Sequence, residues 1–117
     1  MLPYNKVTVD LRWITDTESF HAVFAETLGF PYFYGKNRDA WIDCMTSLDM
    51  PSHGMTSVHA PSDGVFVLEF ENIDDFKKRC PELFADLIEC SAFVNWRRME
   101  DGGEPPILVL SFCEEST

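Results

Sequence analysis

Residues 31–46 read Pro-Tyr-Phe-Tyr-Gly-Lys-Asn-Arg-Asp-Ala-Trp-Ile-Asp-Cys-Met-Thr. The aromatic start and the glycine are typical of a loop, and Asn37 is a good N-cap for a helix that runs to about Asp49. With about 100° of rotation per residue, this helix places an apolar stripe toward a core. The stripe consists of Trp41, Cys44, Met45 and Leu48. The stretch therefore predicts an aromatic loop followed by an amphipathic helix.

The opposite side of this helix carries a mixed acidic and apolar surface. It consists of Asp39, Ile42, Asp43 and Thr46. Two carboxylates at this spacing repel each other mildly, so folding alone gives little reason for them. An exposed Ile42 between the carboxylates favours a contact surface, because apolar residues ringed by charge are frequent at interfaces. The alternative is a solvated face whose carboxylates pair with Arg38 or Lys36.

Three apolar segments outside this stretch predict strands. Residues 6–12 alternate apolar and polar side chains, the pattern of a half-buried strand. Residues 65–70 and 106–112 are nearly continuous apolar runs. Such runs are typical of parallel strands buried on both faces, or of central strands.

The first connection between these strands holds the helix after Asn37 and one helix before it. Thr15 and Glu18 form a capping-box pattern at the start of that earlier helix, and Gly29 suits its left-handed C-cap. Residues 50–64 carry prolines and glycines without periodicity. They predict an exposed loop longer than most connections in compact domains.

The second connection also predicts two helices. A short one lies near residues 74–79, and a longer one is opened by Pro81 and broken by Gly102 and Gly103. The order is therefore strand, two helices, strand, two helices, strand. Crossovers of this length imply parallel strands, so the fold class is α/β. A chain of this length suits one domain spanning residues 1–117.

The charge of the chain indicates what it can bind. Twenty acidic residues against nine basic ones give a formal net charge of -11. Nucleic-acid binding needs Lys and Arg to replace counterions, so direct contact with nucleic acid is not expected. A cationic protein is the natural counterpart, although acidity can also serve solubility alone.

Other features exclude several classes of protein. The N-terminus shows no signal peptide, and no apolar run approaches the roughly 20 residues of a membrane helix, so we expect a cytoplasmic protein without membrane contact. The cysteines form no CxxC pair, which predicts reduced, mostly buried thiols and no metal or cofactor. They are Cys44, Cys80, Cys90 and Cys113.

An enzyme is the rival interpretation, and it depends on the histidines. His21 is predicted on the polar side of its helix, and His53 and His59 lie in the long loop. No Cys or Ser stands in a nucleophile motif, and no groups converge as an active site requires. The sequence therefore favours a binding protein over an enzyme.

The motif Pro-x-Phe-Tyr-Gly-x-Asn-x-Asp-Ala-x-x-Asp-Cys-x-Thr at 31–46 resembles the signature of the barstar family, in which a Tyr-Tyr-Gly-x-Asn loop leads into an acidic helix. Weaker similarity extends over most of the chain. The resemblance implies a small two-layer α/β fold, with a three-stranded parallel sheet and helices packed on one side. It also implies an inhibitor that blocks the basic active site of a secreted ribonuclease inside the producing cell.

The resemblance assigns candidate partner-binding residues. Asp43 matches the carboxylate that enters the nuclease's phosphate-binding cluster of Arg and Lys, and Asp39 matches a second carboxylate. Phe33 matches the aromatic residue that packs over the nuclease's catalytic groups. Further contacts are implied for Gly35, Asn37 and Thr46, and for Ile42, which stands where the family example has a Trp.

Two departures from the family example leave the target open. Tyr32 and Lys36 replace acidic residues, so the loop is less negative. A further acidic contact from the last long helix has two candidates, Glu89 and Glu100. The expected partner is a basic secreted ribonuclease or toxin nuclease, bound 1:1 by a chain that is monomeric when free. The alternatives are immunity against a different toxin nuclease, with specificity in residues 50–64, and a barstar-like domain with a non-nuclease partner.

Overall fold

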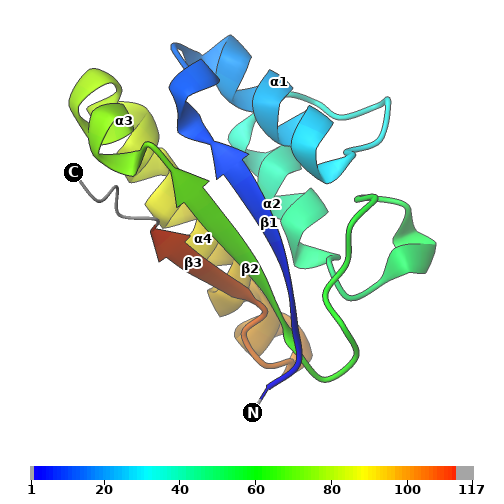
Figure 1. Cartoon of the computed structure of the whole chain (residues 1–117). Helices are drawn as coiled ribbons and strands as arrows, with labels where there is room; N and C mark the ends of the chain where they lie inside the picture. The colour runs from blue at the N-terminus through cyan, green and yellow to red at the C-terminus, as the bar shows by residue number, and fades with distance from the viewer. Residues whose placement is uncertain (1, 113–117) are drawn as a thin grey trace.

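The computed structural model describes residues 2–112, and its centre is a three-stranded parallel sheet (Figure 1). The strands are β1 (Tyr4–Asp10), β2 (Val65–Glu71) and β3 (Leu108–Phe112), and β2 lies between the other two. Tyr4 pairs with Val65, and Phe66 pairs with Leu108. The predicted parallel sheet is therefore confirmed. The first strand begins and ends two residues earlier than predicted, because a 3-10 turn, η1 (Leu11–Trp13), follows Asp10.

The helices lie in the predicted order between the strands. They are α1 (Thr17–Leu28) and α2 (Arg38–Thr46) before β2, and α3 (Ile73–Arg79) and α4 (Pro81–Gly102) after it. In Figure 1, α1, α2 and α4 lie behind the sheet, and the face toward the viewer has no helix over it. This confirms the predicted two-layer fold with helices on one side.

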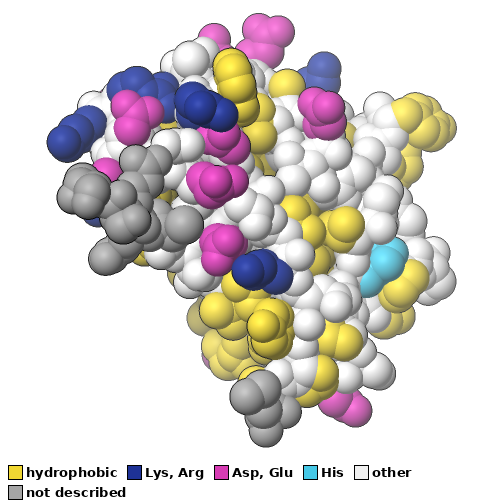
Figure 2. Space-filling model, viewed as in Figure 1, with side chains coloured by type: hydrophobic (Ala, Val, Ile, Leu, Met, Phe, Trp, Pro, Cys, Tyr) yellow, Lys and Arg dark blue, Asp and Glu magenta, His cyan; other side chains and the backbone are white. Residues whose placement is uncertain are grey.

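The central strand buries only one of its faces. Phe66, Leu68 and Phe70 point toward the helices and are fully buried, whereas the alternate residues of β2 are partly or fully exposed. Figure 2 shows the uncovered face, where acidic side chains lie beside hydrophobic ones. Of the two interpretations of the apolar runs, burial on both faces is therefore wrong for the strands. The central position is correct for β2 only, since β3 is an edge strand.

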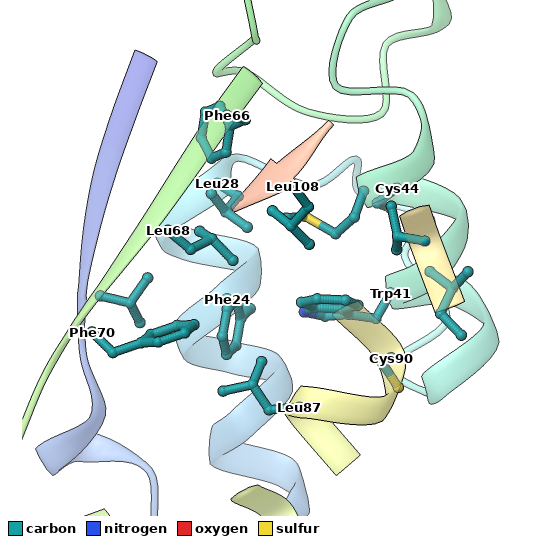
Figure 3. Packing of buried hydrophobic residues seen from close by; sticks show 14 of the residues in the cluster. Phe24, Leu28, Trp41, Cys44, Phe66, Leu68, Phe70, Leu87, Cys90 and Leu108 are labelled. Carbon is teal, nitrogen blue, oxygen red and sulfur yellow. The ribbon is translucent and has the colours of Figure 1, made fainter. Parts of the chain in front are cut away.

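Trp41 of α2 lies at the centre of the core (Figure 3). It is 1% exposed, and its ring meets Phe24 of α1 edge-on with centroids 5.6 Å apart. The other residues of the predicted stripe are buried as well, namely Cys44, Met45 and Leu48. The core stripe of α2 was thus predicted correctly from helical spacing.

The cap of α1 differs from the prediction by one residue. Asp16, rather than Thr15, is the N-cap, and its carboxylate accepts a hydrogen bond of 2.8 Å from the backbone amide of Ser19. The Ser19 hydroxyl in turn accepts a bond from the amide of Asp16, so the capping box is Asp16–Ser19 and Glu18 has no part in it. The predicted C-cap is confirmed, because Gly29 is left-handed with φ of 65°. A Cβ there would also collide with Ser57.

The cap of α2 is the predicted one. The Asn37 side chain accepts a 2.8 Å hydrogen bond from the amide of Ala40. The helix ends at Thr46, earlier than the expected Asp49, yet Leu48 still reaches the core from the following turn. The start of the helix, and with it the outward direction of its side chains, is therefore set by Asn37.

We expect Asn37→Ala to lower the free energy of unfolding by about 1 kcal/mol, because it leaves a helical amide without its acceptor. Urea denaturation followed by circular dichroism measures this change. Asn37→Asp keeps an acceptor at the same position and is the matched control, with a smaller loss. Equal losses in both variants would contradict the capping role.

The segment between α2 and β2 is more closely packed than predicted. It contains a second 3-10 turn, η2 (Pro51–His53), and buries Thr56 and Ala60. The Ala60 amide donates to the Leu48 carbonyl at 2.9 Å, and the Ser57 amide donates to the Leu28 carbonyl at the end of α1, also at 2.9 Å. The prediction of an exposed loop for residues 50–64 is therefore wrong for its second half.

Candidate functional site

The outward side of α2 carries Asp39 and Asp43, which we call the acidic face. Both side chains are exposed, as predicted. Asp43 accepts a 2.7 Å hydrogen bond from the guanidinium group of Arg97 in α4, and its side chain remains 52% exposed. Within residues 2–112, no Lys or Arg lies within ion-pair distance of Asp39. Asp39 therefore has its charge uncompensated by any close cation in the described chain.

Arg38 does not pair with the acidic face, although it stands next to Asp39 in the sequence. Its guanidinium group contacts Asp86 at 2.5 Å and Glu89 at 3.6 Å, both on α4. The alternative prediction, in which Arg38 or Lys36 neutralises the α2 carboxylates, is wrong. The basic side chain that does reach the face, Arg97, comes from a distant part of the sequence.

Ile42 is a correction to the sequence prediction. It was expected to be exposed between the two carboxylates, but it is only 7% exposed. Helix α4 packs beside α2 and covers it. The remaining surface of Ile42 lines a groove of about 510 Å³ between the two helices, together with Asp39, Glu89, Phe93 and Trp96.

The apolar surface next to the acidic face is instead provided by α4. The Phe93 and Trp96 rings lie 5.3 Å apart, and both side chains are exposed. Glu89 lines the same groove as Asp39, so it is the better placed of the two candidates for a further acidic contact. Glu100 lines neither this groove nor the hollows around Asp43.

The aromatic loop before α2 presents one ring outward and anchors another. Phe33 is 62% exposed and packs edge-on against the fully exposed Tyr32, with centroids 5.5 Å apart. Tyr34 is buried, and its hydroxyl lies 2.5 Å from Nδ1 of His21. Phe33, Gly35 and Asp43 line one hollow, so the structure brings these predicted site residues together.

Two predicted polar site residues use their polar groups inside the helix. Asn37 caps Ala40, and the Thr46 hydroxyl donates to the Ile42 carbonyl at 2.6 Å. Thr46 still borders a hollow with Asp43 and Arg97. Thr46 therefore lies next to Asp43, whereas Asn37 lies at the start of α2, and the polar side chains of both bond to the backbone of this helix.

His21 is the second correction. It was predicted on the polar side of its helix, but it is buried against Tyr34 and Phe20. Burial lowers the pKa of His21 below its usual value of 6.5 and raises the pKa of the Tyr34 hydroxyl. A neutral His21 and a protonated Tyr34 hydroxyl thus share one hydrogen bond, and this contact connects α1 to the aromatic loop.

We expect the protein to lose stability as the pH falls below about 6.5, because unfolded His21 binds a proton before the folded protein does. Stability from this residue is complete above the unfolded pKa and declines until the lowered folded pKa is passed. Urea midpoints measured between pH 7.5 and 5 would show the slope. His21→Gln should reduce the slope, whereas His53→Gln, at an exposed position, should keep it. An unchanged slope in His21→Gln would contradict the assignment.

The described cysteines agree with the prediction of reduced thiols. Cys44, Cys80 and Cys90 are free, and Cys44 and Cys90 are buried. Burial, with a smaller effect of Asp43, raises the pKa of Cys44 to about 11, so this thiol is unreactive near neutral pH. Cys113 lies outside the described residues.

The sequence predicted an acidic contact from α4 at Glu89 or Glu100, but it did not predict the contributions of Arg97, Phe93 and Trp96. Arg97 stands 54 residues from the Asp43 that it contacts, and no local pattern connects the two. Phe93 and Trp96 did carry a signal, since they are apolar residues three positions apart on a side of α4 other than that of the buried Leu87 and Val94.

The described residues contain neither a cluster of metal ligands nor a helix that could span a membrane. Within residues 2–112, no three His, Cys, Asp or Glu side chains are grouped as metal ligands. None of the described helices has the length and apolarity needed to cross a membrane.

Comparison with known proteins agrees with this geometry. No curated protein matches the chain. A family model described as "Barstar (barnase inhibitor)" matches residues 4–111, which is nearly the whole chain. The match includes the sheet, the aromatic loop and the acidic face. The chain therefore belongs to the barstar family.

Proposed function

We propose that this protein inhibits a basic ribonuclease by inserting the acidic face into the active site of the enzyme. One observation carries the proposal: Asp39 and Asp43 are exposed on a capped helix, and Asp43 lines a hollow together with the exposed Phe33. Two carboxylates at this spacing can replace substrate phosphates among Arg and Lys side chains. The negative charge of the chain would steer a cationic nuclease toward this face.

The rigidity of α2 supports tight binding. Its core stripe is buried and its N-terminus is capped, so little conformational entropy is lost when the acidic face is covered. Charged hydrogen bonds to Arg are strong when water is excluded from them. Phe33 and the Phe93–Trp96 pair would supply the surrounding apolar surface. We propose a 1:1 complex that forms inside the producing cell.

A second candidate function is immunity against a toxin nuclease other than a barnase-type enzyme. One observation favours it: His53 and Met55 from the 50–64 segment line the hollow beside Asp43. A connecting segment at the edge of a binding face is a natural place for altered specificity. Both functions use the same face and differ only in the enzyme that is bound.

The test is to purify tagged protein from the organism that makes it and to assay RNA hydrolysis by whatever co-purifies. The expected result is a latent ribonuclease, active once the complex is dissociated and silenced again by one equivalent of the protein. The association rate should fall as the salt concentration rises, because salt screens the charges that steer the two proteins toward each other. Recovery of a nuclease that hydrolyses DNA instead would favour the second candidate. Absence of any inhibited nuclease would reject both.

A further inference from the structure

A second hollow on the acidic face has a different chemical character from the carboxylates. It has a volume of about 500 Å³ and lies between α2, the turn after η2, and α4. Besides Asp43, it is lined by Arg97, His53, Ser47, Thr46 and Met55. The Thr46 hydroxyl already donates to the Ile42 carbonyl, and Ser47 lies 3.0 Å from His53. The Arg97 guanidinium group contacts Asp43 through one nitrogen and has further N–H groups that can donate. Arg97 can therefore offer a hydrogen bond to an acceptor in the hollow, although the hollow borders the acidic face.

Arg97 is the arginine of this hollow, and its ion pair with Asp43 contributes little to stability. The two side chains are 38% and 52% exposed, and pairs in such contact with water contribute little to stability. A partner's cation that approaches Asp43 would also approach Arg97. Like charges placed together across an interface are unfavourable, so a uniformly basic partner would be penalised here.

The backbone at Arg97 is held in place by the contacts of the next residue, Arg98, so Arg97 stays near Asp43. The neighbouring Arg98 is buried, and its guanidinium group makes two hydrogen bonds with the Asp49 carboxylate, at 3.0 and 3.1 Å. It also donates to the Thr46 carbonyl at the end of α2. This joins α4 to α2 at the hollow, whereas the Arg97 side chain is 38% exposed and can turn from Asp43 toward a bound group.

We propose that the hollow receives a carboxylate from the partner nuclease, and that Arg97 donates to this carboxylate in the complex. The inference rests on the proposed function and makes it narrower. The cognate nuclease would carry an Asp or Glu next to the basic cluster that meets Asp43. Arg97 would then favour a nuclease that carries both basic and acidic residues opposite Asp43 and Arg97. It would disfavour a nuclease that carries only basic residues there.

The test measures the inhibition constant for the ribonuclease recovered by the purification above. We expect Arg97→Ala to weaken inhibition by about tenfold or more, and Arg97→Glu to weaken it further. Arg12→Ala is the matched control, because it removes the same charge from another exposed ion pair, that with Asp10 at 2.8 Å. Its effect should stay below about threefold. Replacing the nuclease's facing Asp or Glu by Lys should restore binding to Arg97→Glu.

Several results would overturn the inference. If Arg97→Ala tightens inhibition, Arg97 is repelled by the bound nuclease. If Arg97→Ala leaves inhibition unchanged, Arg97 does not contribute to binding. If no acidic residue of the nuclease couples to position 97, the hollow does not hold a carboxylate. These results leave the proposed function intact as long as Asp43→Ala weakens inhibition. If the wild-type protein inhibits no nuclease, the proposed function fails first and the inference falls with it.

Discussion

Asp43→Ala is expected to weaken inhibition of the target ribonuclease by roughly 30-fold to several thousand-fold. Removing one partner of a covered, hydrogen-bonded charge pair at an interface costs about 2–5 kcal/mol, and each 1.4 kcal/mol is about tenfold in affinity. Asp43 is placed for this role because it is exposed on a rigid helix and is shared by the hollow of Phe33 and the hollow of Arg97. The inhibition constant and the dissociation rate measure the loss.

The structure provides a closely matched control for this variant. Asp75 in α3 also accepts a 2.7 Å contact from an arginine, Arg79, and its side chain is 55% exposed. Asp75→Ala should therefore leave inhibition nearly unchanged, apart from a small effect of net charge on the association rate. Asp43→Asn, which keeps the shape and removes the charge, should resemble Asp43→Ala. Full inhibition by Asp43→Asn would show that the carboxylate does not act as a phosphate mimic.

Trp41→Ala is expected to lower the free energy of unfolding by about 3–5 kcal/mol. Small domains have total stabilities of only about 5–15 kcal/mol, so this variant should be close to unfolding. Trp41 meets Phe24 of α1 edge-on in the core, and its removal would leave a cavity there (Figure 3). Urea denaturation followed by circular dichroism measures the change.

Trp96→Ala is the control for this prediction. It makes the same chemical change at a position that is 51% exposed, so we expect a loss of less than about 1 kcal/mol. Unlike Trp41→Ala, it would remove surface from the groove beside Asp39. The two variants therefore distinguish Trp41, which stabilises the core, from Trp96, which lies in the groove beside the acidic face. Comparable losses of stability would contradict this separation.

Local patterns of sequence were sufficient for most of the fold. The helical spacing of Trp41, Cys44, Met45 and Leu48 predicted which side of α2 is buried, because a helix turns by a fixed angle per residue. The alternation of strands with helical connections likewise predicted the parallel sheet. The carboxylates of the acidic face followed from the same helical geometry.

The features that the sequence did not predict depend on distant parts of the chain. Ile42 lies on the outward side of α2 when the helix is considered alone, but α4 packs there and buries it. His21 is buried because the aromatic loop folds back and brings Tyr34 to it. Arg97 reaches Asp43 only once α2 and α4 are side by side. Helical periodicity contains no information on such neighbours.

The parallel pairing of β1 with β2 has a consequence for the timing of synthesis. Thr8 and Glu69 pair across the sheet although 61 residues separate them, and α2 lies within that interval. Pairing over such a separation is slow, because the entropy of closing the loop must be overcome before the contacts form. Arg97, Phe93 and Trp96 are synthesised later still, because they belong to α4, which ends at Gly102. The acidic face therefore reaches its final surroundings only after residues up to Gly102 have been synthesised. Under the proposed function, a cell that also makes the target ribonuclease depends on which of the two proteins matures first.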